Sequence, residues 1–555
     1  MAKRSTWIIV AAVVVVIAIV AASVYVFLLA PRNKLPVELW YNSEGHYGDT
    51  EDELATILKS SLEKTNRVQV TLKSDPWAVY RQNWVNQRMP VFLLGWYPDY
   101  FDTDDYVSPF LSTAGAASLG SFYTNSEVDA LITQEQSTAD PAARQTLFTQ
   151  IQGKLADDVP YIPLFSGTAQ AAYVSSVQNV YLHPVSFKWF IITKPGATEL
   201  KGATTDKIIS LDPASAYDYF SIEVINQVFD TLLVYEPIEA QLVAGLAMEV
   251  PSATNGGISA DGKTYTYNLK PGITFHDGTP LTAQIVKDSI ERVIRLDIAG
   301  SAAFLLYDVG ALGKTPNIEV VDSDTVRFHL ARPVSFFNDL MAFSVSAPVP
   351  PSYNQAGEQP STVGSVIGTG PYRLTTHQAD QLIVLEEYDE YYGGSLYASF
   401  GISKIPAVPK VSIEILGTAT NLKQSIETKA VDVAYRTLNP DDLVDLQTRA
   451  QTLGLTVSLG ASPQIRYLVI NVNLVPDVRV RQAIAYLVDR ALIDNSVFRG
   501  TVEPLYSMVP ANMPYASPVF QARYGDANLN AANSILSQLG YAVPFHAEAV
   551  ARDWF

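Results

Sequence analysis

The sequence contains no cysteine, which excludes disulfide bonds, thiolate catalysis, zinc–thiolate sites and lipid attachment through an N-terminal cysteine. Basic residues are also scarce: 38 Lys and Arg stand against 56 Asp and Glu, which gives a formal net charge of -18. Without a run of Lys or Arg to neutralise phosphates, nucleic acid is excluded as a partner, and neutral or cationic partners are favoured. The six histidines are scattered without an HxxxH pair, so we expect neither a metal site nor a cofactor.

Catalytic motifs are missing as well. The sequence contains neither a GxSxG elbow nor a cysteine, so a hydrolase would lack its nucleophile. The segment GALGKT, Gly310–Thr315, ends like a phosphate loop, but Asp308 stands where the first glycine is required. We therefore predict a protein that is not an enzyme.

One long apolar run is present near the start of the chain. Trp7–Leu29 carries no charge and, at about 1.5 Å per helical residue, is long enough to cross a hydrocarbon layer of about 30 Å. It is longer than the apolar core of a signal peptide, and Ala21–Ser23 is a poor cleavage site, so we favour a retained transmembrane anchor. Basic residues flank the run on both sides and decide its orientation only weakly; we expect a single-pass protein of the cell membrane with its globular part extracellular.

The rest of the 555-residue chain, 48% hydrophobic overall, is large enough for at least two cores and shows mixed α/β patterning. Val37–Tyr41, Val68–Leu72 and Val91–Leu94 are predicted strands. Asp140 followed by Pro141 predicts a helix start. Further along the chain, the prolines of Val159–Phe165 predict an extended segment. The Pro-Gly pair in Ile191–Lys201 predicts a linker, and Val478–Arg490 is a predicted helix with a buried apolar stripe.

The segment GWYPDYFDTDDY, Gly95–Tyr106, gathers aromatic rings and carboxylates without a base. Rings can wall a pocket while an ionised aspartate binds an ammonium group, so a cation-binding site is one interpretation. A polar surface loop with a buried tryptophan is the other. Calcium ligation by the acidic residues is a weaker alternative than a solvated acidic turn, because an oxygen cage needs about six ligands. The residues that it would use are Asp102, Asp104 and Asp105.

Several longer segments resemble the extracellular solute-binding proteins of family 5, the peptide and nickel binders of ABC importers. The longest is DGKTYTYNLKPGITFHDGTPLTAQIVKDSIERVI, Asp261–Ile294; shorter ones are Ser210–Asp218, Ile367–Leu374, Val384–Gly394 and Asn471–Arg490. The resemblance implies a two-lobed α/β fold like that of the periplasmic binding proteins (type II, cluster C). His276, in the turn FHDGTP, is expected to be structural.

The GW segment and VPYIPLF also match the family, but there they lie near the C-terminus. The order here is therefore similar to a circular permutation, with residues 191–201 joining the family's old ends, or to a wrongly joined gene model. The domains expected on this basis are an anchor at 7–29, the first part of lobe 2 at 37–162, a continuous lobe 1 at 163–415, and the second part of lobe 2 at 416–545. The tail after Gly540 has no assigned role.

The resemblance implies that Asp99 binds the α-ammonium group of a peptide. The other candidate pocket residues are aromatic: Trp77, Trp96, Tyr97, Tyr100 and Tyr217. The chain departs from the oligopeptide binders in two ways, because no arginine precedes the GW pair to meet the ligand's carboxylate and Thr103 replaces the proline after Asp102.

Two functions follow from the resemblance. The first is a membrane-anchored receptor that closes around a peptide or another small cationic ligand and delivers it to the permease of an ABC importer. The alternative is a permuted binding domain reused as a cell-surface structural or self-assembling subunit, which would form homo-oligomers.

Overall fold

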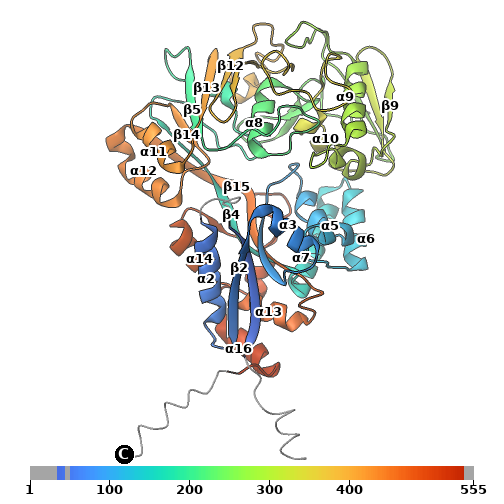
Figure 1. Ribbon diagram of the computed structural model, residues 1–555. Coiled ribbons are helices and arrows are strands. Elements are labelled where there is room, and N and C mark those ends of the chain that lie inside the picture. The colour runs from blue at the N-terminus through green and yellow to red at the C-terminus, as the bar shows by residue number, and fades with distance from the viewer. Residues whose placement is uncertain (1–33, 44–49, 543–555) are drawn as a thin grey trace, which may run out of the picture.

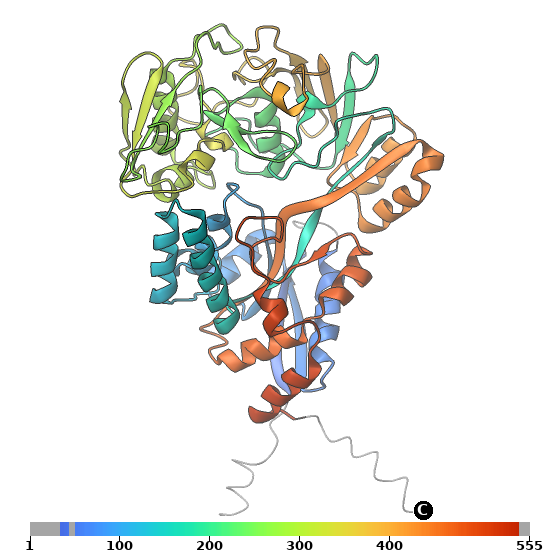
Figure 2. The same ribbon diagram turned by 180° about the vertical axis from the view of Figure 1, so that it is seen from behind.

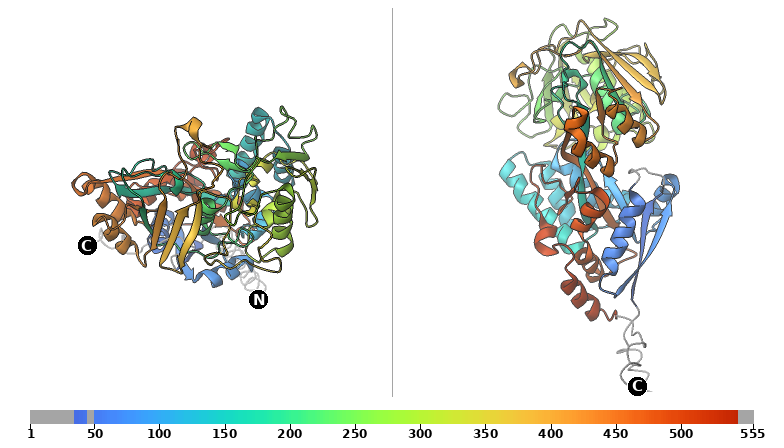
Figure 3. Two further views of the ribbon diagram at one scale, coloured as in Figure 1. Left: turned by 90° about the horizontal axis from the view of Figure 1, so that it is seen from above. Right: turned by 90° about the vertical axis from the view of Figure 1, so that its left-hand side faces the viewer.

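The computed structural model describes residues 34–43 and 50–542. These residues form an upper half and a lower half in the view of Figure 1, and the side view of Figure 3 shows the same division. Helices and strands alternate in both halves, as the mixed α/β patterning predicts.

Separate hydrophobic cores define the halves. One core packs buried side chains from residues 35–165 against others from 465–536, and we call residues 34–43, 50–165 and 465–542 the lower half. Three further clusters are built from residues 171–459, which we call the upper half; Tyr100 is the buried residue of the lower half that joins one of them. The lower half is thus assembled from both ends of the described chain, and the upper half from one continuous stretch.

The elements of the lower half flank a small parallel set of strands. They are β1 (Leu35–Asn42), α2 (Glu51–Glu63), β2 (Val68–Asp75), α3 (Trp77–Val85), β3 (Val91–Trp96), α4 (Ser108–Leu111), α5 (Thr113–Ser118), α6 (Ser126–Gln136), α7 (Pro141–Asp158), α13 (Val478–Leu487), α14 (Arg490–Ile493), β16 (Glu503–Pro504), α15 (Val519–Arg523) and α16 (Leu529–Gln538).

The upper half contains more of the short strands. Its elements are β5 (Leu200–Thr204), α8 (Tyr219–Val228), β6 (Leu233–Tyr235), β7 (Leu242–Ala244), β8 (Thr264–Asn268), α9 (Ala283–Leu296), β9 (Asn317–Val320), β10 (Thr325–His329), α10 (Phe337–Leu340), β11 (Tyr372–Gln378), β12 (Leu382–Glu387), β13 (Lys410–Ile415), α11 (Ala419–Glu427), β14 (Val433–Tyr435) and α12 (Pro440–Leu453).

Two long strands connect the halves. β4 (Tyr161–Val174) and β15 (Leu455–Ile470) pair antiparallel along most of their length, from Leu455 opposite Val174 to Val469 opposite Tyr161. Figure 2 shows them running together from the upper half into the lower half. They make one continuous sheet through both halves, in the order β11-β12-β13-β5-β14-β4-β15-β3-β1-β2 with β16 beside β4.

Local sequence signals predicted several elements correctly. The strands β1, β2 and β3 are confirmed, and Asp140 caps α7 by accepting from the Ala143 N–H at 2.8 Å. The stripe predicted within Val478–Arg490 is buried in α13, at Ala483, Ile484 and Leu487. Leu147, Ile151 and Leu155, which share one face of α7, are buried as well. His276 accepts from or donates to backbone groups of the segment 368–370, in keeping with a structural role.

The division between the halves differs from the expected one at its second boundary. Leu422 and Ile426 of α11 and Leu446 of α12 are buried in one cluster with Ala203 of β5, so residues 416–455 belong to the upper half. The expected boundary after Ile415 lies too early. The chain returns to the lower half inside β15, because a strand that continues through both halves has no turn or linker to mark the crossing.

Across residues 34–43 and 50–542, we find no helix with the length and apolarity that a membrane crossing requires. The expected membrane helix, Trp7–Leu29, lies outside the described residues, as does the chain from residue 543 onward.

The two ends of the described chain meet at Arg67. The Leu35 N–H donates to the Arg67 carbonyl at 2.8 Å, and the Arg67 guanidinium donates to the Tyr541 carbonyl. In the upper half, the expected linker contains a turn closed by the Ala197 N–H and the Lys194 carbonyl at 3.0 Å. Gly196 in this turn has φ +74°, a conformation that glycine adopts without steric cost.

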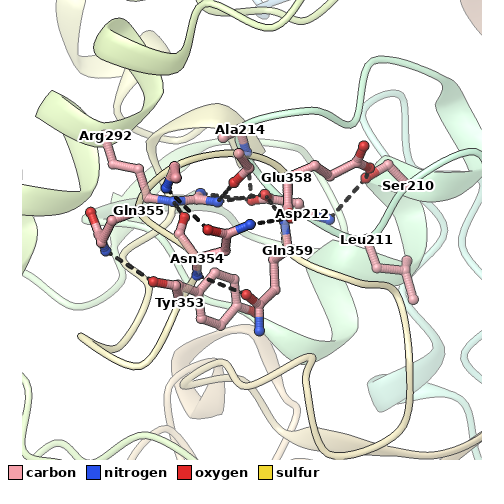
Figure 4. Close-up of polar contacts among 12 residues, drawn as sticks. Ser210, Leu211, Asp212, Ala214, Arg292, Tyr353, Asn354, Gln355, Glu358 and Gln359 are labelled. Carbon is pink, nitrogen blue, oxygen red and sulfur yellow. Dashed lines mark hydrogen bonds and ion pairs between the residues drawn. The ribbon is translucent and has the colours of Figure 1, made fainter.

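A buried ion pair fastens α9 to two loops of the upper half (Figure 4). Arg292, 1% exposed, donates to both oxygens of Asp212 at 2.9 and 2.7 Å. The same guanidinium donates to the carbonyls of Asn354 and Gly357. Asp212 also accepts the Gln359 N–H at 2.8 Å, so one charge pair ties together three chain segments.

Candidate functional site

A cleft of about 660 Å³ lies between the two halves, beside the crossing strands. Its lining includes Tyr97, Phe165, Arg466 and Phe498 of the lower half, His183, Asp206, Tyr219 and Arg436 of the upper half, and Gly167, Ser462 and Gln464 of the crossing strands. This volume falls within the roughly 300–1,000 Å³ that is usual for small-molecule sites. Since both halves supply walls, any change in the angle between them changes the shape of the cleft.

A loop of the lower half, Tyr97–Asp105, packs against the upper half next to this cleft, and we call it the clasp loop. It follows β3 directly, so a central strand of the sheet fixes its starting point. Each of its first aromatic or acidic residues contacts one residue of the upper half: Tyr97 with Tyr219 (ring centroids 4.4 Å apart), Asp99 with Tyr217 (2.6 Å), Tyr100 with Phe336 (4.8 Å) and Phe101 with Tyr235 (5.9 Å). The clasp loop is therefore a direct link between the halves.

Asp99 is the buried carboxylate of this link. It is 6% exposed, and its Oδ1 accepts from the Tyr217 hydroxyl at 2.6 Å. Burial raises the pKa of Asp99 to about 7, and the hydrogen bond from Tyr217 opposes that shift. Since Tyr217 keeps 36% of its surface exposed, the partner of Asp99 can be reached from solvent. A carboxylate that titrates near neutrality and lacks a cationic partner among the described residues is suited to bind an ammonium group.

Asp105, held by Trp96, fixes the backbone of Asp99. The Asp105 Oδ2 accepts from the Trp96 indole N–H at 3.0 Å and from the Asp99 backbone N–H at 2.9 Å. Burial and the nearby charge of Asp99 raise the pKa of Asp105 well above its usual range. Two carboxylates this close disfavour each other's ionised form, so a cation arriving at Asp99 would relieve the repulsion.

The remaining carboxylates of the clasp loop have protein partners. Asp102 makes a two-pronged ion pair with Arg144 at 2.8 and 2.7 Å. Asp104 accepts from the Gln136 amide at 3.0 Å and from the Tyr100 hydroxyl. Within residues 34–43 and 50–542, no group of three or more His, Cys, Asp or Glu is arranged to hold a metal ion. These acidic residues therefore fasten the loop to α6 and α7.

Residues 243–549, more than half of the chain, match the family model for the bacterial extracellular solute-binding proteins, family 5, middle region. The chain belongs to this family. Its mixed α/β fold in two halves with a cleft between them is accordingly that of a family-5 solute-binding protein, and the class to which it belongs binds solutes.

Two curated relatives illustrate the family. The glutathione-binding protein GsiB of Pectobacterium atrosepticum is 27% identical over 377 residues, which are 66% of each chain. GsiB of Escherichia coli strain K12 is 26% identical over 352 residues, which are 62% of each chain. The match thus spans somewhat under two thirds of the length of these relatives, which are named as binding proteins.

Solved structures of lower identity also align. The Escherichia coli murein tripeptide-binding protein MppA aligns at 21% identity and a TM-score of 0.46, over 62% of this chain and 67% of that one. NikA of Brucella suis, in complex with Fe(III)-EDTA, aligns at 19% identity and a TM-score of 0.48, over 63% and 66%.

The structure brings some of the predicted site residues of this solute-binding protein together. Tyr97 lines the cleft; Asp99 and Tyr217 meet each other two residues along from the lining residues Tyr97 and Tyr219 and are not themselves part of the lining. Trp77 instead packs in α3 on Tyr80 and Trp84, with centroids 6.1 and 5.5 Å away.

Two further candidates hold the site without lining the cleft. Trp96 packs on Phe110 and holds Asp105, and Tyr100 is buried in the core of the upper half. Neither ring belongs to the cleft lining.

The charged residues on the cleft wall were not predicted. Arg436 follows β14 directly and lies against Tyr219 and Glu223 of α8 and against Asp206, so its partners come from two other parts of the chain. Tyr219 stands two residues after the predicted Tyr217, so it was the one member that a search for neighbouring rings would find. Arg436 carries no local signal, because only the fold brings its partners together.

Proposed function

We propose that this protein captures short peptide-like ligands with a free amino group outside the cell and delivers them to an ABC importer. The observation that supports the proposal is Asp99, a buried carboxylate with a pKa of about 7 that joins the two halves beside the cleft. Two relatives are named for binding glutathione, a peptide-like molecule, and this is in keeping with the proposal.

Through the contact between Asp99 and Tyr217, a bound ligand would change how the two halves are held together. An ammonium group would replace the neutral Tyr217 hydroxyl as the donor to ionised Asp99, and would add the attraction between opposite charges. Since Asp99 belongs to the lower half and Tyr217 to the upper half, this replacement requires the halves to separate along the clasp loop. Closure around the ligand then follows from contacts that only the closed form makes.

Retention of peptides from a mixture tests the proposal. The purified protein is incubated with a random tripeptide library, either with free amino termini or N-acetylated, and retained molecules are identified by mass spectrometry. We expect the protein to retain the free-amine library and to leave the acetylated one in solution. Retention of neither library, or of both equally, would contradict the proposal.

We further propose that Trp7–Leu29 anchors the protein in the cell membrane with its described part outside. The support is the uncharged length of this run, since a stretch of about 20 apolar residues suffices for a span. Recovery of the full chain in the membrane fraction, and its loss on deletion of residues 1–33, is the expected result; a chain found in the soluble fraction at full length would contradict it.

We also propose that the chain is a circular permutation of the family's order, joined at residues 191–201. Both described ends lie at Arg67, and the joint is a surface turn at Lys194–Ala197. Termini that lie close together at the surface are what permit such a rearrangement. A relinked chain that begins at Ala197, ends at Lys194 and connects Tyr541 to Leu35 through a short Gly-Ser linker is therefore expected to fold and to retain the same peptides.

The control for the relinked chain has its new ends inside β4, at Gly167, where opening the chain interrupts the crossing strand. This control is expected to lose the cooperative unfolding transition that circular dichroism records for the parent. Equal loss of folding in both relinked chains would contradict the permutation.

A further inference from the structure

Arg436 stands on the cleft wall in a backbone conformation that is rare for a residue with a side chain. Its φ is +70°, and the Thr437 N–H donates to the Tyr435 carbonyl at 3.0 Å around it, which makes a γ-turn with Arg436 at the centre. Such a conformation costs free energy and persists only where the surroundings hold it, often at a binding site. The turn aims the guanidinium at the cleft, since Arg436 belongs to the lining.

The guanidinium of Arg436 has partners on the protein for some of its N–H donors and leaves others available. It lies 3.9 Å from the centroid of the Tyr219 ring, which in turn packs on Tyr97 across the cleft. Nη2 donates to Asp206, and Nη1 is 3.4 Å from Glu223. Nε has no hydrogen-bond partner among the described residues, although a guanidinium offers five N–H donors. The side chain is 19% exposed, so donors remain available to a molecule in the cleft.

The other arginine of the cleft lining differs in each of these respects. Arg466 is 4% exposed; its Nε donates to the Leu94 carbonyl at 3.1 Å, and its Nη2 donates to Glu51 at 2.9 Å. Its contacts fasten β15 to β3 and α2 of the lower half. Arg436 is therefore the better placed of the two for a ligand.

The two carboxylates beside Arg436 are not equivalent. Glu223 is 1% exposed at its side chain, is bound by the Tyr435 hydroxyl, and has its pKa raised to about 7 by burial. Asp206 is 28% exposed and sits at the cleft, where water can solvate it if it leaves the arginine. Asp206 can thus be exchanged for another carboxylate, whereas Glu223 is fixed.

We propose that Arg436 binds a carboxylate group of the ligand, and that Asp206 occupies this position until the ligand's carboxylate displaces it. The inference rests on the proposed capture of free-amine peptides and specifies it: the ligand is a zwitterion, with its ammonium at Asp99 and its carboxylate at Arg436. The contacts of Asp99 with Tyr217 and of Tyr97 with Tyr219 lie two residues apart on both sides, so the proposed cation site neighbours the ring pair that packs on Arg436.

Tripeptide libraries with free and with amidated carboxyl ends test this assignment. We expect the unmodified protein to retain the free acids at least about tenfold more strongly than the amides, because a bidentate guanidinium–carboxylate contact is lost on amidation. Arg436→Gln is expected to remove this preference, and Arg436→Lys to restore part of it. Asp206→Asn is expected to strengthen retention of the free acids several-fold and to leave the amides unchanged, since it removes the competing carboxylate.

Arg449→Gln is the matched control, because Arg449 is also bonded to two carboxylates, Glu427 and Asp445, but on α12 outside the cleft lining. It should alter neither library's retention. Circular dichroism monitors the folding of each variant. If Arg436→Gln does not fold, the retention of free acids by Asp206→Asn still tests the assignment.

Equal retention of acids and amides by the unmodified protein would overturn the role of Arg436 and leave the proposed capture of free amines intact. Weaker retention of the acids by Asp206→Asn would also overturn it, because Asp206 would then bind the ligand itself. If neither the acids nor the amides are retained, the proposed function fails, and this inference with it.

Discussion

Asp99→Asn is expected to weaken the binding of free-amine tripeptides by about 2–5 kcal/mol, the usual cost of removing one partner of a buried charge pair. This corresponds to a loss of about 30-fold to several thousand-fold in affinity. Asparagine has nearly the same volume and can still accept from the Tyr217 hydroxyl, so the variant removes the charge and keeps the contact between the halves. Isothermal titration calorimetry with the tripeptide that the unmodified protein retains best measures the change.

Asp129→Asn serves as the matched control, because Asp129 of α6 is half-buried and bonds to Thr113, which is not part of the clasp loop. Its affinity for the tripeptide should equal that of the unmodified protein. Tyr217→Phe provides a second comparison, since it removes the hydroxyl that competes with the ligand and should not weaken binding. An unchanged affinity in Asp99→Asn would remove Asp99 from the site.

The pH dependence of binding should follow the pKa of Asp99. The ligand-free carboxyl has a pKa of about 7, and the ligand binds its ionised form, so affinity falls as pH drops. With a peptide amine of pKa about 7.7–8.0 on the other side, affinity peaks between pH 7 and 8 and decreases about 50-fold by pH 5. Asp99→Asn should flatten the acidic limb; a limb that persists in this variant would assign the titration to another group.

The ligand-free protein should respond to pH in the opposite sense. The folded-state pKa of Asp99 is raised from 3.8 to about 7, so the stability that this group contributes is fully present below about pH 4 and is lost as pH rises through 7. Ligand binding thus requires the ionised form of this buried carboxyl, whereas stability favours the protonated form. Such a conflict is expected where a site gives up stability for function.

Signals confined to a few neighbouring residues predicted local structure well. Asp140 followed by Pro141 is enough to start α7, because the aspartate supplies the capping oxygen and the proline needs no hydrogen-bond partner. Short segments rich in apolar residues likewise predicted β1 to β3. The second crossing between the halves was missed because it lies inside β15, where the strand pattern simply continues.

The site residues, too, could be predicted from the sequence only in part. The sequence singled out Asp99 and Tyr217, and the fold joins them although they are 118 residues apart. The cluster of carboxylates around Asp99, however, could not be divided into binding and structural members from spacing alone. Asp102 is structural because Arg144 of α7 binds both its oxygens, a fact that only tertiary packing provides.

Asp212→Asn is expected to lower the free energy of unfolding by about 3–5 kcal/mol, because it leaves the charge of Arg292 buried without its partner. Both side chains of this pair are at most 1% exposed, so water cannot replace the lost interaction. The effect should extend beyond the pair, since Asp212 also accepts backbone N–H groups of Ala214 and Gln359 and so holds two loops. Urea-induced unfolding followed by circular dichroism measures the change.

Asp380→Asn provides the control for this stability experiment. The Lys207–Asp380 pair is more than half exposed on both sides, and surface pairs of this kind contribute between 0 and about 1 kcal/mol. The double variant Asp212→Leu with Arg292→Met should regain part of the lost stability, because it removes both charges and leaves only backbone groups unpaired. If Asp212→Asn and Asp380→Asn were destabilised equally, the pair in Figure 4 would not fasten α9 to its loops.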